Sequence, residues 1–139
     1  YKRQDLEAEG QRLSKAQLAR IHEAKTAALL TSSLRLGAMS ANATPRQLDA
    51  LTEFGKSLGL AFQVIDDILD VTQSTATLGK TAGKDAQVDK ATYPGILGLD
   101  KSRQEARRLT RKALAALQGL GPRAARLDEL AHYLLDRDF

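Results

Sequence analysis

One amide and three carboxylates fall at helical spacing in the most informative stretch of this sequence. Residues 58–71 (LGLAFQVIDDILDV) place them at positions i, i+3, i+4 and i+7: Gln63, Asp66, Asp67 and Asp70. On an α-helix this spacing puts the four side chains on one face. Like charges this close repel, and more strongly when desolvated, so the carboxylates need positive charge opposite them. Oxygen ligands of this kind suit Mg²⁺, which typically joins one or two carboxylates to substrate phosphates.

The alternative interpretation of this acidic face is structural: the carboxylates face solvent, or pair with arginines of a neighbouring helix. The position of Lys25 favours the chemical interpretation, since it stands four residues from both Ile21 and Leu29, inside an apolar stripe. A lysine there is costly unless it meets an anion. The alternative for Lys25 is to reach water, or to pair with Glu23 or an aspartate.

Three further lysines stand among glycines, threonines and aspartates in residues 73–94, a long stretch without an apolar pattern: Lys80, Lys84 and Lys90. Connections of this length are usually functional or disordered, and a charged surface loop is the alternative. The acidic helix, the lysine in an apolar stripe and the lysine loop together predict a site for a metal-bound diphosphate. His22, three residues before Lys25, is predicted to be a hydrogen-bonded structural histidine rather than a proton-transfer group.

Helices must position these residues, because apolar residues recur with helical period and no useful stretch alternates with period two. We expect an all-α chain with four helices, over residues 14–37, 44 to about 71, 101–118 and 124–136. The first two begin with capping boxes at Ser14 and Thr44. The residues predicted to face inward are Leu18, Ile21, Ala28 and Leu29 on the first helix, Ala106, Leu109, Ala113 and Leu117 on the third, and Leu127, Leu130, Ala131 and Leu134 on the fourth.

The patterns on these helices also predict how they pack. Wide apolar stripes on the first two indicate that both are surrounded on several sides. Gly55 and Gly59, one turn apart, predict close helix packing rather than ligand contact. The basic residues of the third helix are predicted to form a solvated face: Arg103, Arg107, Arg108, Arg111 and Lys112.

Composition narrows the function classes. The 139 residues include no cysteine, which excludes disulfides and thiolate metal sites and is compatible with a cytoplasmic location. No apolar run approaches the roughly 18 residues that a membrane-spanning helix needs, and the first residues do not resemble a signal peptide. The net charge of +4 leaves nucleic acid, acidic membranes and phosphorylated small molecules as partners, but three Tyr and three Phe are few for a base-stacking platform.

Four motifs resemble, in family order, those of the trans-isoprenyl diphosphate synthases, the polyprenyl synthetase family. Residues 62–70 (FQVIDDILD) resemble the second aspartate-rich motif of that family, and residues 22–29 (HEAKTAAL) resemble its Lys-Thr helix. Residues 78–85 (LGKTAGKD) resemble the lysine loop that follows, and residues 90–94 (KATYP) the second loop lysine before a Tyr-Pro turn. The resemblance covers about residues 5–139 and is nearest to the bacterial short-chain group, which includes farnesyl and geranylgeranyl diphosphate synthases. It implies the all-α isoprenoid synthase fold, a helical bundle.

The resemblance implies a prenyltransferase that joins an allylic diphosphate, dimethylallyl or geranyl, to isopentenyl diphosphate by ionisation, condensation and proton loss. Asp66 and Asp70 would bind Mg²⁺, with Mn²⁺ as the alternative ion, and Asp67 would lie in or beside that shell. Thr26 and Gln63 would lie near the reacting allylic carbon, where oxygen atoms stabilise developing positive charge. The diphosphates would be contacted by basic residues: Lys25 and Lys80, which would also neutralise the leaving group, Lys90, which would shield the diphosphates, and Arg137.

Complete members of the family carry a first aspartate-rich motif in an N-terminal half that these residues do not match. We therefore expect residues 1–139 to be the C-terminal part of a single polyprenyl synthetase domain, inactive alone, from a protein that is homodimeric as the family is. The sequence begins YKRQ where the family has Gly-Gly-Gln, so Gln4 is given no role. The alternatives are a non-catalytic helical subunit or diphosphate-binding module, a class I terpene cyclase fragment, and a basic nucleic-acid-binding domain, which the loop lysines among aspartates disfavour.

Overall fold

The computed structural model describes residues 13–77 and 91–135, and these are helical apart from short connections. In chain order the elements are α2 (Lys15–His22), the π-helix η1 (Glu23–Ala27), α3 (Ala28–Ser40), α4 (Pro45–Thr77), α5 (Tyr93–Leu97), α6 (Leu99–Leu117), the 3₁₀-helix η3 (Gln118–Ala124) and α7 (Ala125–Leu135). The predicted all-α class is confirmed, with no strand in the described ranges. None of the described helices has an apolar stretch long enough to cross a membrane.

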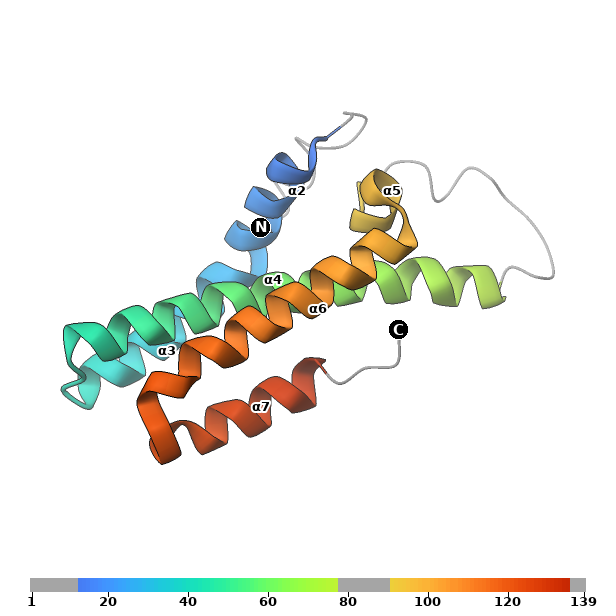
Figure 1. Ribbon diagram of the computed structural model, residues 1–139. Coiled ribbons are helices and arrows are strands. Elements are labelled where there is room, and N and C mark those ends of the chain that lie inside the picture. The colour runs from blue at the N-terminus through green and yellow to red at the C-terminus, as the bar shows by residue number, and fades with distance from the viewer. Residues whose placement is uncertain (1–12, 78–90, 136–139) are drawn as a thin grey trace.

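The central element is α4. It packs along α6 and α3, with α2, α5 and α7 on its flanks (Figure 1). At 33 residues it is roughly 50 Å long, and its C-terminal part extends past α6 (Figure 1). All four residues of α6 that were predicted to face inward are buried. The core face of α4 is formed by Phe54, Leu58, Ala61, Val64, Ile65 and Ile68.

Both predicted helix starts are confirmed as capping boxes. The Gln17 backbone N–H donates to Ser14 Oγ at 3.3 Å, and Gln17 Oε1 accepts from the Ser14 N–H at 2.9 Å. Thr44 and Gln47 form the same reciprocal pair, at 3.4 and 2.8 Å. Each pair satisfies backbone donors that a helix start leaves without an internal partner. Local sequence therefore determines where these two helices begin.

A π turn interrupts the helical stretch that the sequence predicted as one regular helix. The backbone N–H of Ala28 bonds to the carbonyl of Glu23, five residues earlier instead of four. The buried side chains follow the same count, with spacings of four, five and four: Leu18, His22, Ala27 and Thr31. Because the extra residue shifts the buried face, the prediction that Ala28 and Leu29 face inward was wrong: both are exposed, Leu29 at 71%.

The α7 helix also differs in part from its predicted face. Ala131 is buried, and Leu127 and Leu134 pack against the core as predicted. Leu130 is 44% exposed, so its prediction was wrong, and Leu135 is buried instead. The 3₁₀-helix η3 connects α6 to α7.

The predicted connection over residues 73–94 is partly helical. α4 continues to Thr77, and α5, which the sequence did not predict, begins at Tyr93. Thr92 caps α5 by accepting the Gly95 N–H at 3.2 Å. The remaining residues, 78–90, are not among those described. Four predicted functional residues, and Gln4, therefore lie outside the described chain: Lys80, Lys84, Lys90 and Arg137.

Large apolar side chains form an exposed row on α3. Leu29, Leu36 and Met39 are 71%, 66% and 56% exposed. The sequence predicted that this helix is surrounded on several sides. In the described part of the chain, however, neighbouring elements pack against only part of the α3 surface. An exposed apolar row of this kind is typical of a contact surface.

Candidate functional site

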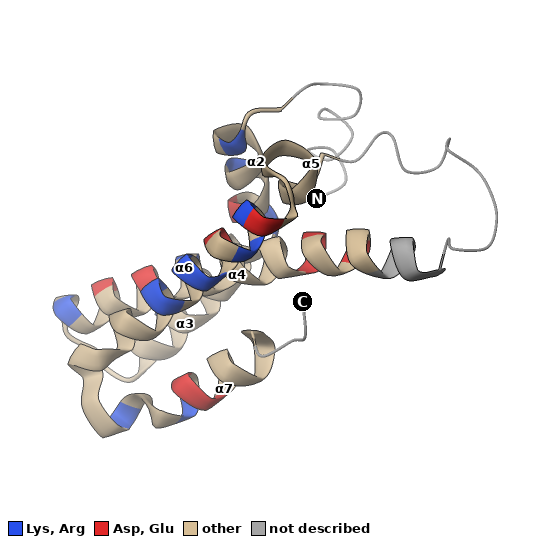
Figure 2. Ribbon diagram, turned by 45° about the vertical axis from the view of Figure 1, so that its right-hand side comes forward, with Lys and Arg blue, Asp and Glu red and all other residues tan. Residues whose placement is uncertain are grey.

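The four polar residues predicted to share one face of α4 lie in different environments. Gln63 and Asp67 are buried, Asp66 is half-buried and Asp70 is exposed. Acidic positions recur on the C-terminal part of α4 (Figure 2). Asp66 and Asp70, one helical turn apart, are therefore the accessible carboxylates of the motif, whereas Asp67 is turned toward the interior.

Asp66 and Asp70 suit one class of divalent ion. Among the described residues, no three or more His, Asp or Glu side chains gather into a group that could hold a metal by themselves. Two carboxylates one turn apart fit Mg²⁺, which keeps several waters and binds through one or two carboxylates together with substrate phosphates. The same oxygen donors suit Mn²⁺. This donor set is thus compatible with the predicted ion, provided that a ligand supplies the remaining oxygens.

One oxygen of Asp67 takes part in two hydrogen bonds. His22 Nε2 lies 3.0 Å from Asp67 Oδ2, and the backbone N–H of Tyr93 donates to the same oxygen at 3.0 Å. The His22 ring also stacks on the Tyr93 ring, with centroids 5.7 Å apart and planes at 15°. All three residues are buried. The prediction that His22 is hydrogen-bonded is confirmed, and its structural role stays a prediction.

The Tyr93 phenol shares this dry environment. Burial raises its pKa to about 12, and the carboxylates of Glu105 and Asp67 act in the same direction because they disfavour a second negative charge. Tyr93 is therefore neutral at physiological pH. It contributes to the cluster through its ring face and its backbone N–H.

Lys25 and Thr26 both belong to the π turn η1, and both are half-buried. This turn packs directly on α4. A Cβ added to Gly59 of α4 would stand 2.6 Å from the Ala27 Cβ and 2.9 Å from the Ala27 nitrogen. Since Gly59 lies one turn before Gln63, η1 contacts the part of α4 that leads into the acidic residues.

A second glycine makes the same kind of contact one turn earlier on α4. A Cβ on Gly55 would stand 2.9 Å from the Thr31 Cα and from the Thr31 Oγ1. The prediction that Gly55 and Gly59 serve close helix packing is therefore confirmed. Together they bring η1 and α3 close to the backbone of α4.

Sequence reasoning missed the π turn and the buried position of Asp67. No residue type distinguishes the π turn from regular helix, although π turns inside helices are frequent at functional sites. The only signal was indirect, in the glycine pair that accommodates it. For Asp67 there was no signal, because its two partners are 45 and 26 residues away along the chain.

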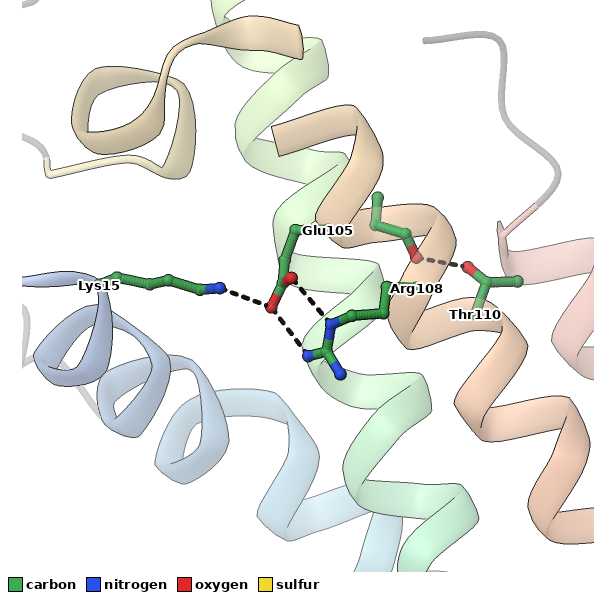
Figure 3. A network of polar contacts seen from close by, with 5 residues as sticks. Lys15, Glu105, Arg108 and Thr110 are labelled. Atoms are coloured by element: carbon green, nitrogen blue, oxygen red, sulfur yellow. Dashed lines mark hydrogen bonds and ion pairs between the residues drawn. The ribbon is translucent and has the colours of Figure 1, made fainter. Parts of the chain in front are cut away.

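A separate polar network joins α2 to α6 (Figure 3). Glu105 accepts two hydrogen bonds from the Arg108 guanidinium at 2.9 Å, and Lys15 Nζ lies 3.0 Å from Glu105 Oε1. These contacts, led by that with Arg108, lower the pKa of Glu105 to about 2. The adjacent groove has a volume of about 540 Å³ and includes Arg107 and Arg111. The predicted solvated face is confirmed for Arg107, Arg108, Arg111 and Lys112, which are exposed, but not for Arg103, which is half-buried.

Comparisons with known proteins agree with this geometry. Residues 2–121 match the family model described as polyprenyl synthetase. The chain is 52% identical over 119 residues to a chloroplastic geranylgeranyl pyrophosphate synthase of Catharanthus roseus, covering 85% of this chain and 33% of that protein. It is 46% identical over 138 residues to the farnesyl diphosphate synthase of Escherichia coli, covering 96% of this chain and 46% of that protein.

Solved structures give the same result. A putative farnesyl-diphosphate synthase from a Marinomonas species superposes with a TM-score of 0.79 at 36% identity, over 96% of this chain and 44% of that one. A geranyltransferase of Helicobacter pylori, complexed with magnesium and isoprenyl diphosphate, gives a TM-score of 0.68 at 35% identity, over 91% of this chain and 42% of that one. The chain thus spans between a third and a half of the length of these proteins.

Proposed function

The chain belongs to the polyprenyl synthetase family, and from this premise we propose that it forms the C-terminal part of the single domain of a short-chain prenyl diphosphate synthase. The whole protein would condense an allylic diphosphate, dimethylallyl or geranyl, with isopentenyl diphosphate. The observation that carries the proposal is the packing of η1, which bears Lys25 and Thr26, on Gly59 of α4, next to the turn that leads to the accessible pair Asp66 and Asp70.

Each residue has a role in this proposal. Asp66 and Asp70 would hold Mg²⁺, which would neutralise charge on the diphosphate leaving group. Lys25 would donate hydrogen bonds to that diphosphate from the π turn. Thr26 and Gln63 would present oxygen atoms to the allylic carbon as it becomes positive. The family resemblance adds three basic residues that lie outside the described chain: Lys80, Lys90 and Arg137.

Burial supports the carbocation part of this chemistry. Gln63 is 7% exposed, and its neighbours on the same part of α4 are buried and apolar: Ala61, Val64 and Ile65. Water, which would capture a carbocation, has little access to the Gln63 amide, and an amide oxygen of low exposure interacts more strongly with positive charge than one in water does. Gln63 is therefore suited to stabilise positive charge rather than to bind the metal.

Assembly and location are part of the same proposal. We take the homodimer from the family resemblance, and the exposed row on α3 supports a contact surface of some kind. A cytoplasmic location agrees with the absence of cysteine from the 139 residues. No nucleic acid is needed as a partner.

The test is a turnover assay of the full-length parent protein. Labelled isopentenyl diphosphate with geranyl or dimethylallyl diphosphate should give a prenyl diphosphate product in the presence of Mg²⁺ and none after chelation with EDTA. Cyclic hydrocarbon formed without isopentenyl diphosphate would favour the terpene cyclase alternative. Metal-dependent diphosphate binding in calorimetry without any turnover would favour a binding module.

A further inference from the structure

A single carboxylate oxygen, Asp67 Oδ2, joins three segments of the chain. Its partners are His22, the last residue of α2, and Tyr93, the first residue of α5. The side chains of His22 and Asp67 are 5% and 3% exposed. The contact is therefore internal, unlike the accessible positions of Asp66 and Asp70.

This burial is unfavourable for a metal ligand. Mg²⁺ keeps several waters when it binds to a protein carboxylate, so a ligand must be reachable by a hydrated ion. A side chain that is 3% exposed, with Oδ2 already accepting from two donors, does not meet that condition in this structure. A buried carboxylate is also costly unless its hydrogen bonds are good. The buried Asp67 carboxylate is therefore better suited to hold His22 and Tyr93 in place than to bind a metal.

Within residues 13–77 and 91–135, no second polar group bonds to the His22 ring. Among the described residues, His22 Nδ1 is buried without a hydrogen-bond partner. A carboxylate accepts and does not donate, so the shared proton belongs to Nε2 when Asp67 is ionised. The Tyr93 ring fixes the plane of the imidazole by stacking, and Asp67 fixes its direction.

From this geometry we infer that Asp67 is a positioning residue, which acts through His22 to place the π turn that carries Lys25 and Thr26. Two contacts with α4 bracket that turn. His22 precedes it and is held by Asp67, and Ala27 ends it and is pressed against Gly59. The two anchor points on α4 are eight residues apart, or about 12 Å along its axis. Together they fix both the height and the rotation of η1 on α4.

The inference rests on the proposed function and deepens it, because it divides the acidic motif into two roles. Asp66 and Asp70 face the metal and its phosphates, whereas Asp67 aligns the cationic segment opposite them. Precise placement matters for such a site, since a displacement of about 1 Å can lower turnover about 10²-fold.

Substitution by asparagine separates the two roles. An asparagine at position 67 keeps the shape, and its carbonyl oxygen can accept from both His22 and Tyr93, but it carries no charge for a metal. In the full-length parent we expect Asp67→Asn to retain kcat within about threefold of the unsubstituted protein, and Asp67→Ala to lower it about 10²-fold. The Mg²⁺ concentration for half-maximal rate should be unchanged in both. Asp66→Asn, the matched control one residue away, should lose turnover or require much more Mg²⁺.

The partner residue provides an independent readout. His22→Ala should lower kcat to a similar extent as Asp67→Ala, and the double variant should be no worse than Asp67→Ala alone, because Asp67 acts on turnover through His22. His22→Gln, whose amide can donate in place of Nε2, should recover part of the loss. In EDTA, Asp67→Ala and His22→Ala should each lower the melting temperature by several degrees and Asp67→Asn by much less.

The outcomes distinguish this inference from the proposed function. Absence of turnover in the unsubstituted parent with Mg²⁺ contradicts the proposed function, and the EDTA melting series still tests the anchor. Normal turnover in the parent combined with equal defects in Asp67→Asn and Asp66→Asn, including a raised Mg²⁺ requirement, makes Asp67 a metal ligand and overturns the inference. Additive effects of His22→Ala and Asp67→Ala overturn it as well.

Discussion

Gly59 lies against the backbone of Ala27, so that a methyl group added to Gly59 would stand 2.6 Å from the Ala27 Cβ and 2.9 Å from its nitrogen. One of these two Ala27 atoms belongs to the backbone and the other is a Cβ fixed to it, so neither can move aside by a change of rotamer. Gly59→Ala must therefore push η1 from α4. We expect it to destabilise the protein by about 1–3 kcal/mol, in spite of the better helix propensity of alanine.

Gly37→Ala is the matched control, because Gly37 also lies in a helix but has no atom within 4 Å of an added Cβ. This change should stabilise the protein by about 0.5–1 kcal/mol. Urea unfolding of the two variants measures the difference. Equal stabilities would show that the π turn does not press on α4 as described.

Removal of the accessible carboxylates should abolish catalysis without unfolding the protein. Asp66→Ala and Asp70→Ala in the full-length parent are each expected to lower turnover about 10²- to 10³-fold, because they remove groups that stabilise charge in the transition state. Asp49→Ala, at an exposed position near the start of the same helix, should leave turnover unchanged. The isopentenyl incorporation assay measures all three. Near-normal kinetics in Asp66→Ala would contradict the metal role.

The 139-residue chain alone should be inactive, because Asp66 and Asp70 belong to the motif that resembles the family's second aspartate-rich motif, and the family resemblance places the first one in an N-terminal half that these residues do not match. The same incorporation assay, run with geranyl diphosphate and Mg²⁺, should give no product from this chain. Clear turnover by these residues alone would show that they contain a complete site.

Glu105 should give the protein an acid-sensitive component of stability. The pKa of this carboxyl is lowered from 4.5 to about 2 in the folded protein by Arg108 and Lys15. Since the folded pKa is below the unfolded one, the stabilisation is fully present above about pH 4.5 and is lost as the pH falls toward 2. Both cations are half exposed, so the expected contribution is only about 1 kcal/mol after screening.

Unfolding by urea at pH 3 and pH 6 tests this component. Glu105→Gln should be less stable than the unsubstituted protein at pH 6, and the difference should be smaller at pH 3, since the stabilisation is lost completely only below the folded pKa of about 2. Glu129→Gln is the control, because Glu129 and its partner Arg126 are both largely exposed. It should change stability by less than about 0.5 kcal/mol at either pH. An equal effect of the two substitutions at pH 6 would contradict a special role for Glu105.

Sequence patterns predicted what depends on neighbouring residues. The capping boxes at Ser14 and Thr44 are complete within four residues, and the inward face of α6 follows from its regular spacing. The glycine pair on α4 was also correctly interpreted as a packing feature. In each case the feature depends on residues close together in the sequence, so tertiary packing did not alter what the sequence predicted.

The wrong predictions concern residues whose burial depends on segments that are distant in the sequence. Asp66 and Asp67 are adjacent in sequence and share a predicted face, yet Asp67 is buried and bonded to His22 and Tyr93, whereas Asp66 is half-buried. Leu29 was assigned to the core by counting in steps of four across a turn that takes five. No residue type in the sequence indicates the additional residue of the π turn, because that turn depends on how η1 packs against Gly59.

The π turn η1 holds one residue more than a regular helix would need at this point. Deleting any one residue between positions 23 and 26 would leave the buried residues four apart throughout, so His22, Ala27 and Thr31 would still face α4. The segment between His22 and Ala27 would then carry three residues instead of four, and the positions of Lys25 and Thr26 would change. We expect such a deletion to lower turnover of the full-length parent far more than it lowers the melting temperature.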